Sequence, residues 1–301
     1  MAEPAIRVLT FNAGWLRYPL DSQLCPIEGA SDLVPYVAER FDAFPSAFTT
    51  LLKQYPTEII VLQEVYETAL AKATDRFFSG LGYRTLWPHR KDPSRMYPSG
   101  LMVAVKGWHI RKAEFYPFGD SARAGNEKLL DNGALFAELK KGNSHLLLAA
   151  VHLQALAVDR SGKATKPEEV AAFEKQVALT KEKMSQWGRK NLPLLVVGDF
   201  NAGPILGGEP YKKLLDGLDL KSAFFARDIP QAFNATWDQK NKLVAEGDFA
   251  TDPSDMIDHV LFSERAFVVQ EARVVLKDVL PEKPYPLSDH YGLLADLQPR
   301  R

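Results

Sequence analysis

Short apolar runs rich in β-branched and aliphatic residues recur from one end of the chain to the other, and they constrain its fold more than any other feature. Runs of about four to eight such residues, bounded by turn residues, are typical of buried β-strands. The sequence therefore predicts strands over Ile6–Phe11, Ile59–Gln63, Leu101–Lys106, Ala134–Leu139, His145–Val151, Leu194–Val197, Ile257–Phe262, Phe267–Leu276 and Gly292–Leu297.

Three segments between these runs place apolar residues at helical spacing. We predict helices over Val37–Gln54, Tyr66–Leu81 and Glu168–Trp187. Pro45 is expected to start or kink the first helix, and Pro167 is well placed near the start of the last. Few helices set against many strands indicate central sheets with helices covering them.

The composition is that of a globular protein with a substantial core. Of 301 residues, 46% are hydrophobic and 25% are charged, and 37 Lys and Arg balance 38 Asp and Glu to a net charge of -1. This balance excludes overall electrostatic steering toward nucleic acid or anionic membranes, although it permits a local basic patch. Because no linker, low-complexity segment or internal repeat stands out, we predict a single domain over residues 1–301.

Few features of the sequence bear on the cellular compartment. The one cysteine, Cys25, excludes an internal disulfide bond and leaves the redox compartment open. No run approaches the roughly 18 apolar residues of a membrane-spanning helix, and the N-terminus lacks the pattern of a secretory signal. We expect a cytoplasmic protein, or an exported one whose signal has been removed.

Carboxylate and amide side chains stand at the ends of several predicted strands. The run Leu194–Val197 leads through Gly198 to Asp199 and Asn201, which should face the same side because alternate residues of a strand do so. Such a pair can hold a water molecule or a metal-bound oxygen. An Asp/Asn turn after a strand is an equally good interpretation of this segment alone.

Glu64 closes the run Ile59–Gln63 in the same way, and Asn12 follows Ile6–Phe11. A carboxylate at the end of a buried strand must be paired, solvated or bound to a metal. Mg²⁺ prefers few carboxylates and several water molecules, which leaves room for phosphate oxygens. Asn12, taken alone, is better interpreted as a turn residue.

Aspartate and histidine residues supply candidate groups for proton transfer. Asp258 lies in the run Ile257–Phe262, and Asp289 and His290 precede the last strand. An Asp–His pair from separate strands fixes the tautomer of the imidazole and stabilises its cation, as a general base requires. His152 ends another strand, where a structural role is the commoner one for a lone histidine. The predicted site leaves out His89, His109, His145 and His259.

Six pieces of the sequence occur in one order and span nearly the whole chain: Thr10-Phe11-Asn12, Leu62-Gln63-Glu64-Val65, Val151-His152-Leu153-Gln154, Gly198-Asp199-Phe200-Asn201, Ile257-Asp258-His259-Val260-Leu261 and Ser288-Asp289-His290. Together they resemble the endonuclease/exonuclease/phosphatase superfamily, which includes pancreatic deoxyribonuclease, abasic-site endonucleases, inositol-polyphosphate phosphatases and neutral sphingomyelinases. The resemblance implies a four-layered α/β sandwich, in which two mixed β-sheets pack face to face with helices on the outside. It also implies hydrolysis of a phosphoester substrate, and a monomer is the default in the family.

The resemblance implies a metal site formed by some of these residues. Glu64 is expected to be the principal Mg²⁺ ligand, with Asn12 organising the site and Asp289 beside the metal. Mn²⁺ or another divalent cation is expected to substitute for Mg²⁺.

The remaining residues take roles in hydrolysis by the same resemblance. Asp199 and Asn201 are expected to position the attacking water and the phosphoryl oxygens. His290, oriented by Asp258, is expected to be the general base, and His152 to donate to a phosphate oxygen or the leaving group. In a two-metal mechanism, Asp199, Asn201 and His290 would be ligands instead.

Three segments are most similar to neutral sphingomyelinases, which makes a phospholipid head group the favoured substrate. They are Val151–Ala155, Ser99-Gly100-Leu101 and Ala235–Asn241. Two departures weaken this similarity. Asp131–Leu135 stands where sphingomyelinases often carry Lys-Gly, and no exposed aromatic hairpin for entering membranes is evident.

Other functions on the same fold are alternatives. A nuclease acting on DNA or RNA needs a positively charged groove, whereas clusters such as His89-Arg90-Lys91 are usually solvated surface. Gly14 also stands where abasic-site endonucleases tend to carry an acidic residue. An inositol-phosphate phosphatase is a further alternative, and a non-catalytic binding protein ranks last because every site residue is retained.

The extra length around Tyr18–Tyr36 is expected to roof the active site and narrow its substrate range.

Overall fold

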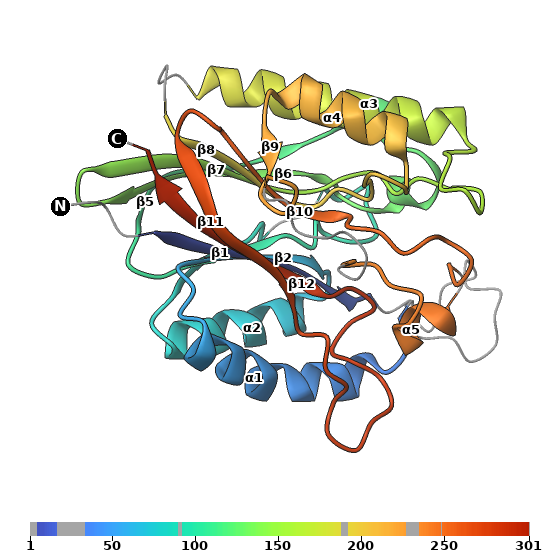
Figure 1. The fold of residues 1–301 in the computed structure, drawn as a ribbon, viewed down its shortest axis with the longest axis horizontal. Coiled ribbons are helices and arrows are strands. Elements are labelled where there is room, and N and C mark those ends of the chain that lie inside the picture. The colour runs from blue at the N-terminus through green and yellow to red at the C-terminus, as the bar shows by residue number, and fades with distance from the viewer. Residues whose placement is uncertain are drawn as a thin grey trace.

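The computed structural model describes residues 5–16, 34–89, 92–187, 192–226, 235–247 and 249–300. Within these ranges, twelve strands form two sheets of six strands each (Figure 1). The first sheet contains, in spatial order, β11 (Phe267–Val275), β12 (Gly292–Pro299), β1 (Ile6–Trp15), β2 (Ile59–Val65), β4 (Met102–Val105) and β3 (Arg84–Leu86). The second contains β5 (His109–Pro117), β6 (Gly133–Lys141), β7 (Ser144–His152), β8 (Leu194–Asp199), β10 (Asp258–Phe262) and β9 (Lys221–Ser222).

Each sheet is mixed, because one parallel pair of strands lies among antiparallel pairs. β1 runs parallel to β2 in the first sheet, and β7 runs parallel to β8 in the second. The register of the second sheet pairs His152 with Asp199, and Asp199 with Asp258. Three residues of the predicted site therefore form one row across β7, β8 and β10.

Helices cover the outer face of each sheet, which gives the molecule four layers (Figure 1). The first sheet is covered by α1 (Val37–Gln54) and α2 (Thr68–Gly80), and the second by α3 (Pro167–Gln186) and α4 (Gly208–Leu218). The short helix α5 (Lys242–Ala245) lies at the end of the molecule opposite the two termini. The fold class predicted from the sequence is thereby confirmed. None of the helices in the described ranges is long and apolar enough to cross a membrane.

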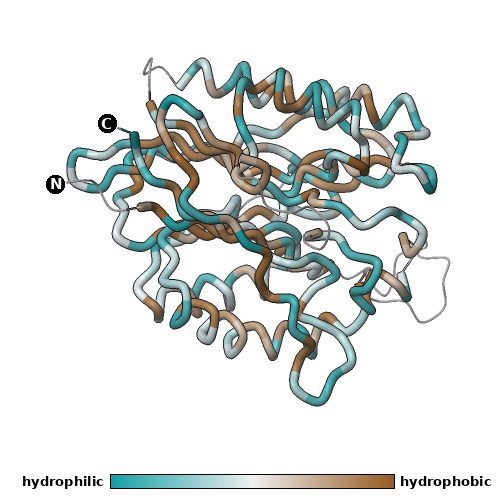
Figure 2. Tube along the Cα trace, in the orientation of Figure 1, coloured by the Kyte–Doolittle hydropathy of each residue, from teal (hydrophilic) through white to brown (hydrophobic). Residues whose placement is uncertain are grey.

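Alternating side chains along the strands build three apolar layers. Val8 and Val61 of the first sheet point between the sheets, where they join a cluster with Leu148 and Val197 of the second. The intervening strand residues pack against α1 and α2 on one side of the molecule, and against α3 and α4 on the other. Figure 2 shows the same pattern, with the most hydrophobic segments in the central strands and the loops mostly hydrophilic. Strands buried on both faces are what continuous apolar runs predict.

All predicted strands and helices are present, with ends that differ by a few residues. The sequence did not predict β3, β5, β9, α4 or α5. Pro45 lies inside α1, which already begins at Val37, so the prediction that this proline starts the helix is wrong. The segment Tyr18–Tyr36 falls mostly outside the described residues, which resume at Val34.

Candidate active site at the ends of both sheets

The residues of the predicted site lie at one end of the sandwich, where β1, β2, β7 and β8 finish and β10 begins. Both sheets contribute to it. The first sheet and the connection leading to β12 supply Asn12, Glu64, Asp289 and His290, and the second sheet with the loop after β8 supplies His152, Asp199, Asn201 and Asp258.

Asn12 joins the two sheets at the site. Its Nδ2 donates to Glu64 Oε1 at 3.0 Å and to Asp199 Oδ2 at 2.9 Å. Its Oδ1 accepts from the backbone amide of Gly14 at 3.0 Å. Because Asn12 is fully buried, these three bonds fix the orientation of its amide group.

Asp199 lies at the centre of the cluster and is almost completely buried. Its Oδ2 is 3.6 Å from His152 Nε2 and 3.8 Å from His290 Nε2, in addition to the hydrogen bond from Asn12. Its Oδ1 accepts from the backbone amide of Asn201 at 2.8 Å. Two imidazole nitrogens therefore face one buried carboxylate.

The backbone at the strand ends adopts conformations that direct these side chains. Glu64 and Asn201 have φ angles of 57° and 50°, in the left-handed region that residues other than glycine rarely adopt. Such strain persists where the surrounding structure enforces it, and it gathers at functional sites. Gly198 has a φ of 155°, and a Cβ there would lie 1.9 Å from the carbonyl oxygen of Val151. Any other residue at position 198 would force β7 and β8 apart beside the site.

Asp258 and His290 form the closest carboxylate–imidazole pair of the site. Asp258 Oδ2 is 2.9 Å from His290 Nδ1, and both side chains are buried. In the neutral form of the ring, a Nδ1–H donated to this carboxylate places the lone pair of His290 on Nε2. Trp237 packs edge-on against the His290 ring at 5.0 Å between centroids, and Thr236 Oγ1 accepts from the Asp258 amide at 3.1 Å. The contact with Trp237 was not predicted from the sequence.

Negative charge concentrates at the site. Burial raises the pKa of Glu64, and the adjacent Asp289 adds to this effect. Burial alone lowers the pKa of His290, but attraction to Asp258 and Asp199 outweighs it and holds that pKa well above its usual value. Burial also raises the pKa of Asp258. A positive charge placed here would offset the repulsion among these carboxylates.

The donor set fits a hard divalent cation. Carboxylates from Glu64, Asp199, Asp258 and Asp289 outnumber the imidazoles, and among the described residues the charged groups that act most strongly on Glu64 and His290 are carboxylates and histidines. Carboxylate oxygens are the protein ligands that Mg²⁺ prefers. A subset formed by Asp199, Asp258 and His290 has donor atoms within 4.8 Å of one another and could itself hold an ion. The site thus offers one donor set around Glu64 and another around Asp199.

His152 has two neighbours that were not predicted from the sequence. The Tyr66 hydroxyl is 3.4 Å from His152 Nδ1, and Tyr66 follows Glu64 by two positions. Glu127 lies on a 3-10 helix, Gly125–Leu129. Burial lowers the pKa of His152, but the surrounding carboxylates, Glu127 among them, raise it above its usual value overall. An aromatic residue so close to the strand-end glutamate was a visible signal, whereas nothing in the sequence marks Glu127.

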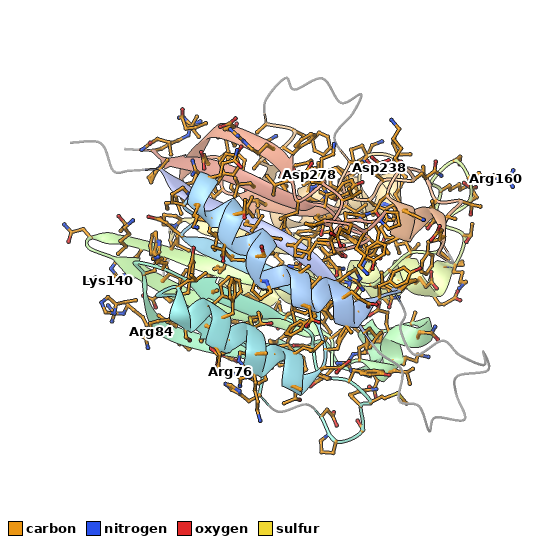
Figure 3. The ribbon with its side chains drawn as sticks, turned by 90° about the horizontal axis from the view of Figure 1, so that it is seen from below. Arg76, Arg84, Lys140, Arg160, Asp238 and Asp278 are labelled. Carbon is orange, nitrogen blue, oxygen red and sulfur yellow. The ribbon has the colours of Figure 1, made fainter. Side chains whose placement is uncertain are left out.

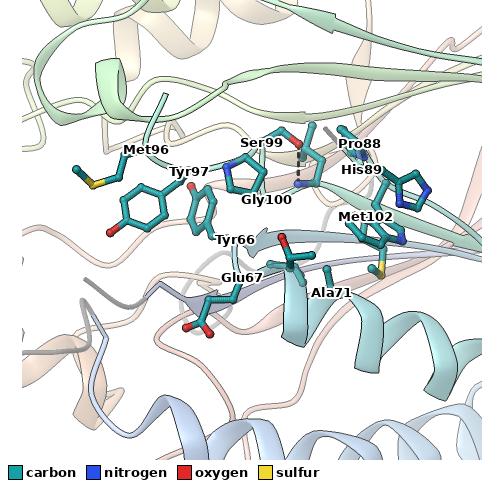
Figure 4. Close-up of a pocket in the computed structure, with 15 residues that line it drawn as sticks. Tyr66, Glu67, Ala71, Pro88, His89, Met96, Tyr97, Ser99, Gly100 and Met102 are labelled. Carbon is teal, nitrogen blue, oxygen red and sulfur yellow. Dashed lines mark hydrogen bonds between the residues drawn. The ribbon is translucent and has the colours of Figure 1, made fainter. Parts of the chain in front are cut away.

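A cavity of about 250 Å³ lies beside this part of the site, between the start of α2 and residues 96–102. Tyr66 and Tyr97 lie side by side in its wall (Figure 4), with ring centroids 6.1 Å apart. Trp87 and His89 line another part of it. The cavity gives an apolar and aromatic surface close to the backbone of Glu64.

His259 takes no part in the cluster, because it faces the opposite side of β10 from Asp258. Its ring nitrogens contact Ser222 Oγ at 3.2 Å and the carbonyl oxygen of Ala202 at 3.0 Å. Burial lowers its pKa to about 4, so the ring is neutral near neutral pH. His259 therefore acts as a structural residue of the second sheet.

Solved structures with this fold share little sequence identity with the chain. The crystal structure of SmcL has a TM-score of 0.69 and 17% identity, with 97% of this chain and 98% of that chain covered. Sphingomyelinase C from Streptomyces griseocarneus has a TM-score of 0.68 and 18% identity, with 98% and 99% covered. D. rerio TDP2, complexed with single strand DNA product, has a TM-score of 0.68 and 12% identity, with 98% and 100% covered. At these identities the likeness establishes the fold alone.

Comparison of the sequence with protein families identifies the family of the chain. No curated protein sequence matches the chain. The Endonuclease/Exonuclease/phosphatase family matches it over residues 9–290, a span that includes every residue of the candidate site. The chain therefore belongs to the Endonuclease/Exonuclease/phosphatase family of metal-dependent phosphoesterases.

Proposed function

We propose that the protein is a Mg²⁺-dependent phosphodiesterase that hydrolyses a phospholipid-type substrate, as a sphingomyelinase does. One observation carries the proposal: Asn12, His152 and His290 meet at Asp199 Oδ2 within 2.9 to 3.8 Å. Together with Glu64, they gather a base, hydrogen-bond donors and anionic ligands around one point. Metal-assisted attack of water on a phosphodiester needs these groups at that proximity.

His290 is the general base of the proposed reaction. In the neutral ring, the hydrogen bond to Asp258 places the lone pair on Nε2, and the same carboxylate stabilises the imidazolium that forms when the ring takes a proton from water. Asp199 and Asn201 position the attacking water and the phosphoryl oxygens. Asn201 gives its Nδ2 to the carbonyl of Leu153 at 2.9 Å, which leaves its side-chain oxygen to accept a hydrogen bond from the water.

His152 donates to a phosphate oxygen or to the leaving oxygen. Although burial lowers the pKa of His152, the carboxylates around the ring raise it overall, so the ring holds the proton that a departing alkoxide needs. The Tyr66 hydroxyl occupies Nδ1 at 3.4 Å. The donating nitrogen is therefore Nε2, which faces Asp199 at 3.6 Å.

Glu64 and Asp289 would hold the Mg²⁺ ion, or Mn²⁺ in its place, with Asn12 organising the site around it. When bound, the ion polarises the phosphoryl group and offsets the negative charge that grows during attack. Asp258 and His290 could hold an ion together with Asp199. Because these two residues are hydrogen-bonded to each other, we assign them to proton transfer instead.

The charges around the site favour a substrate with one phosphate over a polyanion. Within the part of the chain that the structure describes, the charged groups that act most strongly on the buried ionisable residues of the site are carboxylates and histidines rather than Lys or Arg. A nuclease, in contrast, neutralises several phosphates with such residues. Arg160 and Asp238, which carry charges of opposite sign, lie toward the end of the molecule that carries the site (Figure 3).

Two large apolar side chains, Ile205 and Phe249, are 51% and 52% exposed on segments that carry or contact the site. Ile205 follows Asn201 in the loop after β8. Phe249 contacts Trp237 at 6.4 Å between ring centroids, and Trp237 contacts His290. Exposed apolar side chains beside a site can contribute to an interaction surface. Around a phosphodiesterase site, such a surface suits a lipid better than a nucleic acid.

A parallel assay on sphingomyelin vesicles, plasmid DNA and phosphorylated inositols, each with Mg²⁺ and with EDTA, tests the proposal. We expect Mg²⁺-dependent hydrolysis of the lipid and little turnover of the other two. Plasmid nicking without lipid turnover would assign the site to a nuclease, the alternative that the structure of D. rerio TDP2 with single strand DNA product favours. Turnover of the inositols alone would make the protein a phosphatase, and hydrolysis that EDTA leaves untouched would contradict the metal requirement.

A further inference from the structure

Arg40, near the start of α1, is completely buried, which is rare for a charged side chain without a specific partner. A guanidinium has five N–H donors, and here each donates to a different backbone carbonyl oxygen. One side chain thereby ties together three segments of the chain. The acceptors are Ala13 at 2.9 Å, Gly14 at 2.7 Å, Val34 at 3.1 Å, Pro35 at 2.9 Å and Leu287 at 3.2 Å.

Two of these segments carry residues of the active site. Gly14 lies two positions after Asn12, and Leu287 lies two positions before Asp289. The Gly14 amide donates to Asn12 Oδ1 at 3.0 Å, which determines where the Nδ2 group of Asn12 points. A Cβ on Gly14 would lie 2.8 Å from Asp289 Oδ1, so the backbone of Gly14 also forms the wall against which that carboxylate rests.

We propose that Arg40 is a positioning residue for the metal-binding side of the site. By fixing the backbone beside Asn12 and Asp289, it holds both side chains in reach of one ion. The inference rests on the proposed function, because it takes Glu64 and Asp289 as ligands of a divalent cation. Hydrogen bonds outside the ligand set orient the ligands, and losing them typically costs about 10- to 100-fold in metal affinity.

A purely structural role for Arg40 leads to a different expectation. Removing five buried hydrogen bonds lowers stability under either interpretation, so a melting temperature cannot separate them. Metal affinity can separate the two roles, because replacing a merely structural residue leaves the affinity unchanged in every molecule that stays folded. The segment before β12 also keeps a second anchor, since Asn241 Nδ2 donates to the carbonyl oxygens of Ser288 and Asp289 at 2.8 Å each.

The test measures binding of Mn²⁺ alone to the metal-free protein, by calorimetry or electron paramagnetic resonance. We expect Arg40→Met to weaken Mn²⁺ binding about 10- to 100-fold. Arg40→Lys keeps the charge but offers three donors from a single point, so its Mn²⁺ affinity should be intermediate. Arg7→Met is the matched control, because Arg7 pairs with Asp296 at the opposite end of β1. This control should lose stability and keep its Mn²⁺ affinity.

Wild-type Mn²⁺ affinity in folded Arg40→Met protein would overturn the inference. If Arg40→Met does not fold, Arg40→Lys decides the question, and wild-type affinity in that variant overturns it equally. An equal loss of affinity in Arg7→Met would tie Mn²⁺ binding to general stability and would also overturn it. Absence of Mn²⁺ binding to the wild-type protein would instead refute the metal site and the proposed function together.

Discussion

Replacing Asp258 with asparagine tests the proposed general base directly, because it removes a charge while keeping the size of the side chain. Asp258 Oδ2 and His290 Nδ1 are 2.9 Å apart, and both residues are buried. Two unit charges at this distance attract by about 6 kcal/mol at an effective dielectric constant of about 20. The imidazolium that forms as water is deprotonated would lose most of this attraction in Asp258→Asn.

The expected loss in kcat is about 10²- to 10⁴-fold, the range that general acid–base catalysis contributes. In free energy this is about 3 to 5 kcal/mol. That range lies somewhat below the Coulomb value because the dipole of the asparagine amide replaces part of the lost charge.

Stability should not fall with activity. Burial raises the pKa of Asp258, so the ionised carboxylate is less favourable in the folded protein than in the unfolded chain. Neutral asparagine removes that cost at neutral pH but also removes the attraction to the His290 cation, so the two effects oppose each other and the Tm of Asp258→Asn should stay close to that of the wild-type protein. The assay pairs kcat for bis-p-nitrophenyl phosphate at saturating Mg²⁺ with Tm from circular dichroism. A kcat within about tenfold of wild type, or a joint fall of kcat and Tm, would refute the reasoning.

Three further perturbations test the charge states of His290 and His259 and the exposed apolar side chains near the site. The pKa of His290 is raised, so the metal-free folded protein keeps a proton that the unfolded chain loses above about pH 6.5. The unfolding free energy in EDTA should therefore fall as the pH rises above about 6.5, and thermal denaturation should show Mg²⁺ stabilising the protein more strongly at the higher pH; a pH-independent effect of Mg²⁺ would contradict this. His259 has its pKa lowered to about 4, so the unfolded chain takes up a proton first as the pH falls from about 6.5 to about 4. Urea denaturation should show His259→Gln losing about 2 kcal/mol less stability than wild type between about pH 7 and pH 4.5, and equal losses would count against a buried neutral ring. Ile205→Ser combined with Phe249→Ser should slow hydrolysis of sphingomyelin vesicles but not of soluble bis-p-nitrophenyl phosphate, whereas Val268→Ser, 37% exposed on β11, should change neither.

The strands that the sequence predicts are those buried on both faces. β2 is a continuous apolar run because one face meets the second sheet and the other meets α1 and α2. β5 lies at a sheet edge with most of its residues exposed, and β3 and β9 are only three and two residues long. None of these three leaves a hydrophobic pattern to detect. α4 begins beside Gly207 and Gly208 and carries Pro210 in its first turn, which hides the apolar face formed by Tyr211 and Leu214.

The candidate site, too, has one part that the sequence predicts and another part that it does not. Polar side chains that end apolar runs can be found in the sequence, because strand pairing brings such ends to one edge. Arg40 leaves no such signal, since its partners are carbonyl groups up to 247 positions away and every residue has a carbonyl. The left-handed backbone of Glu64 is equally hidden, because glutamate has no preference for that conformation. The side chains of the site are therefore predictable to a large extent, and the backbone that holds them is not.

The division of the site between two sheets has a consequence for how the protein would lose activity on heating. The hydrogen-bonded ladders run within each sheet, whereas contact between the sheets is made largely by apolar side chains. A partial opening along this plane would separate Glu64 from Asp199 while leaving the strands and helices of each half intact. On heating, loss of activity should therefore precede loss of the far-ultraviolet circular dichroism signal. Activity would then be lost when the two sheets separate, before the strands and helices of either half unfold.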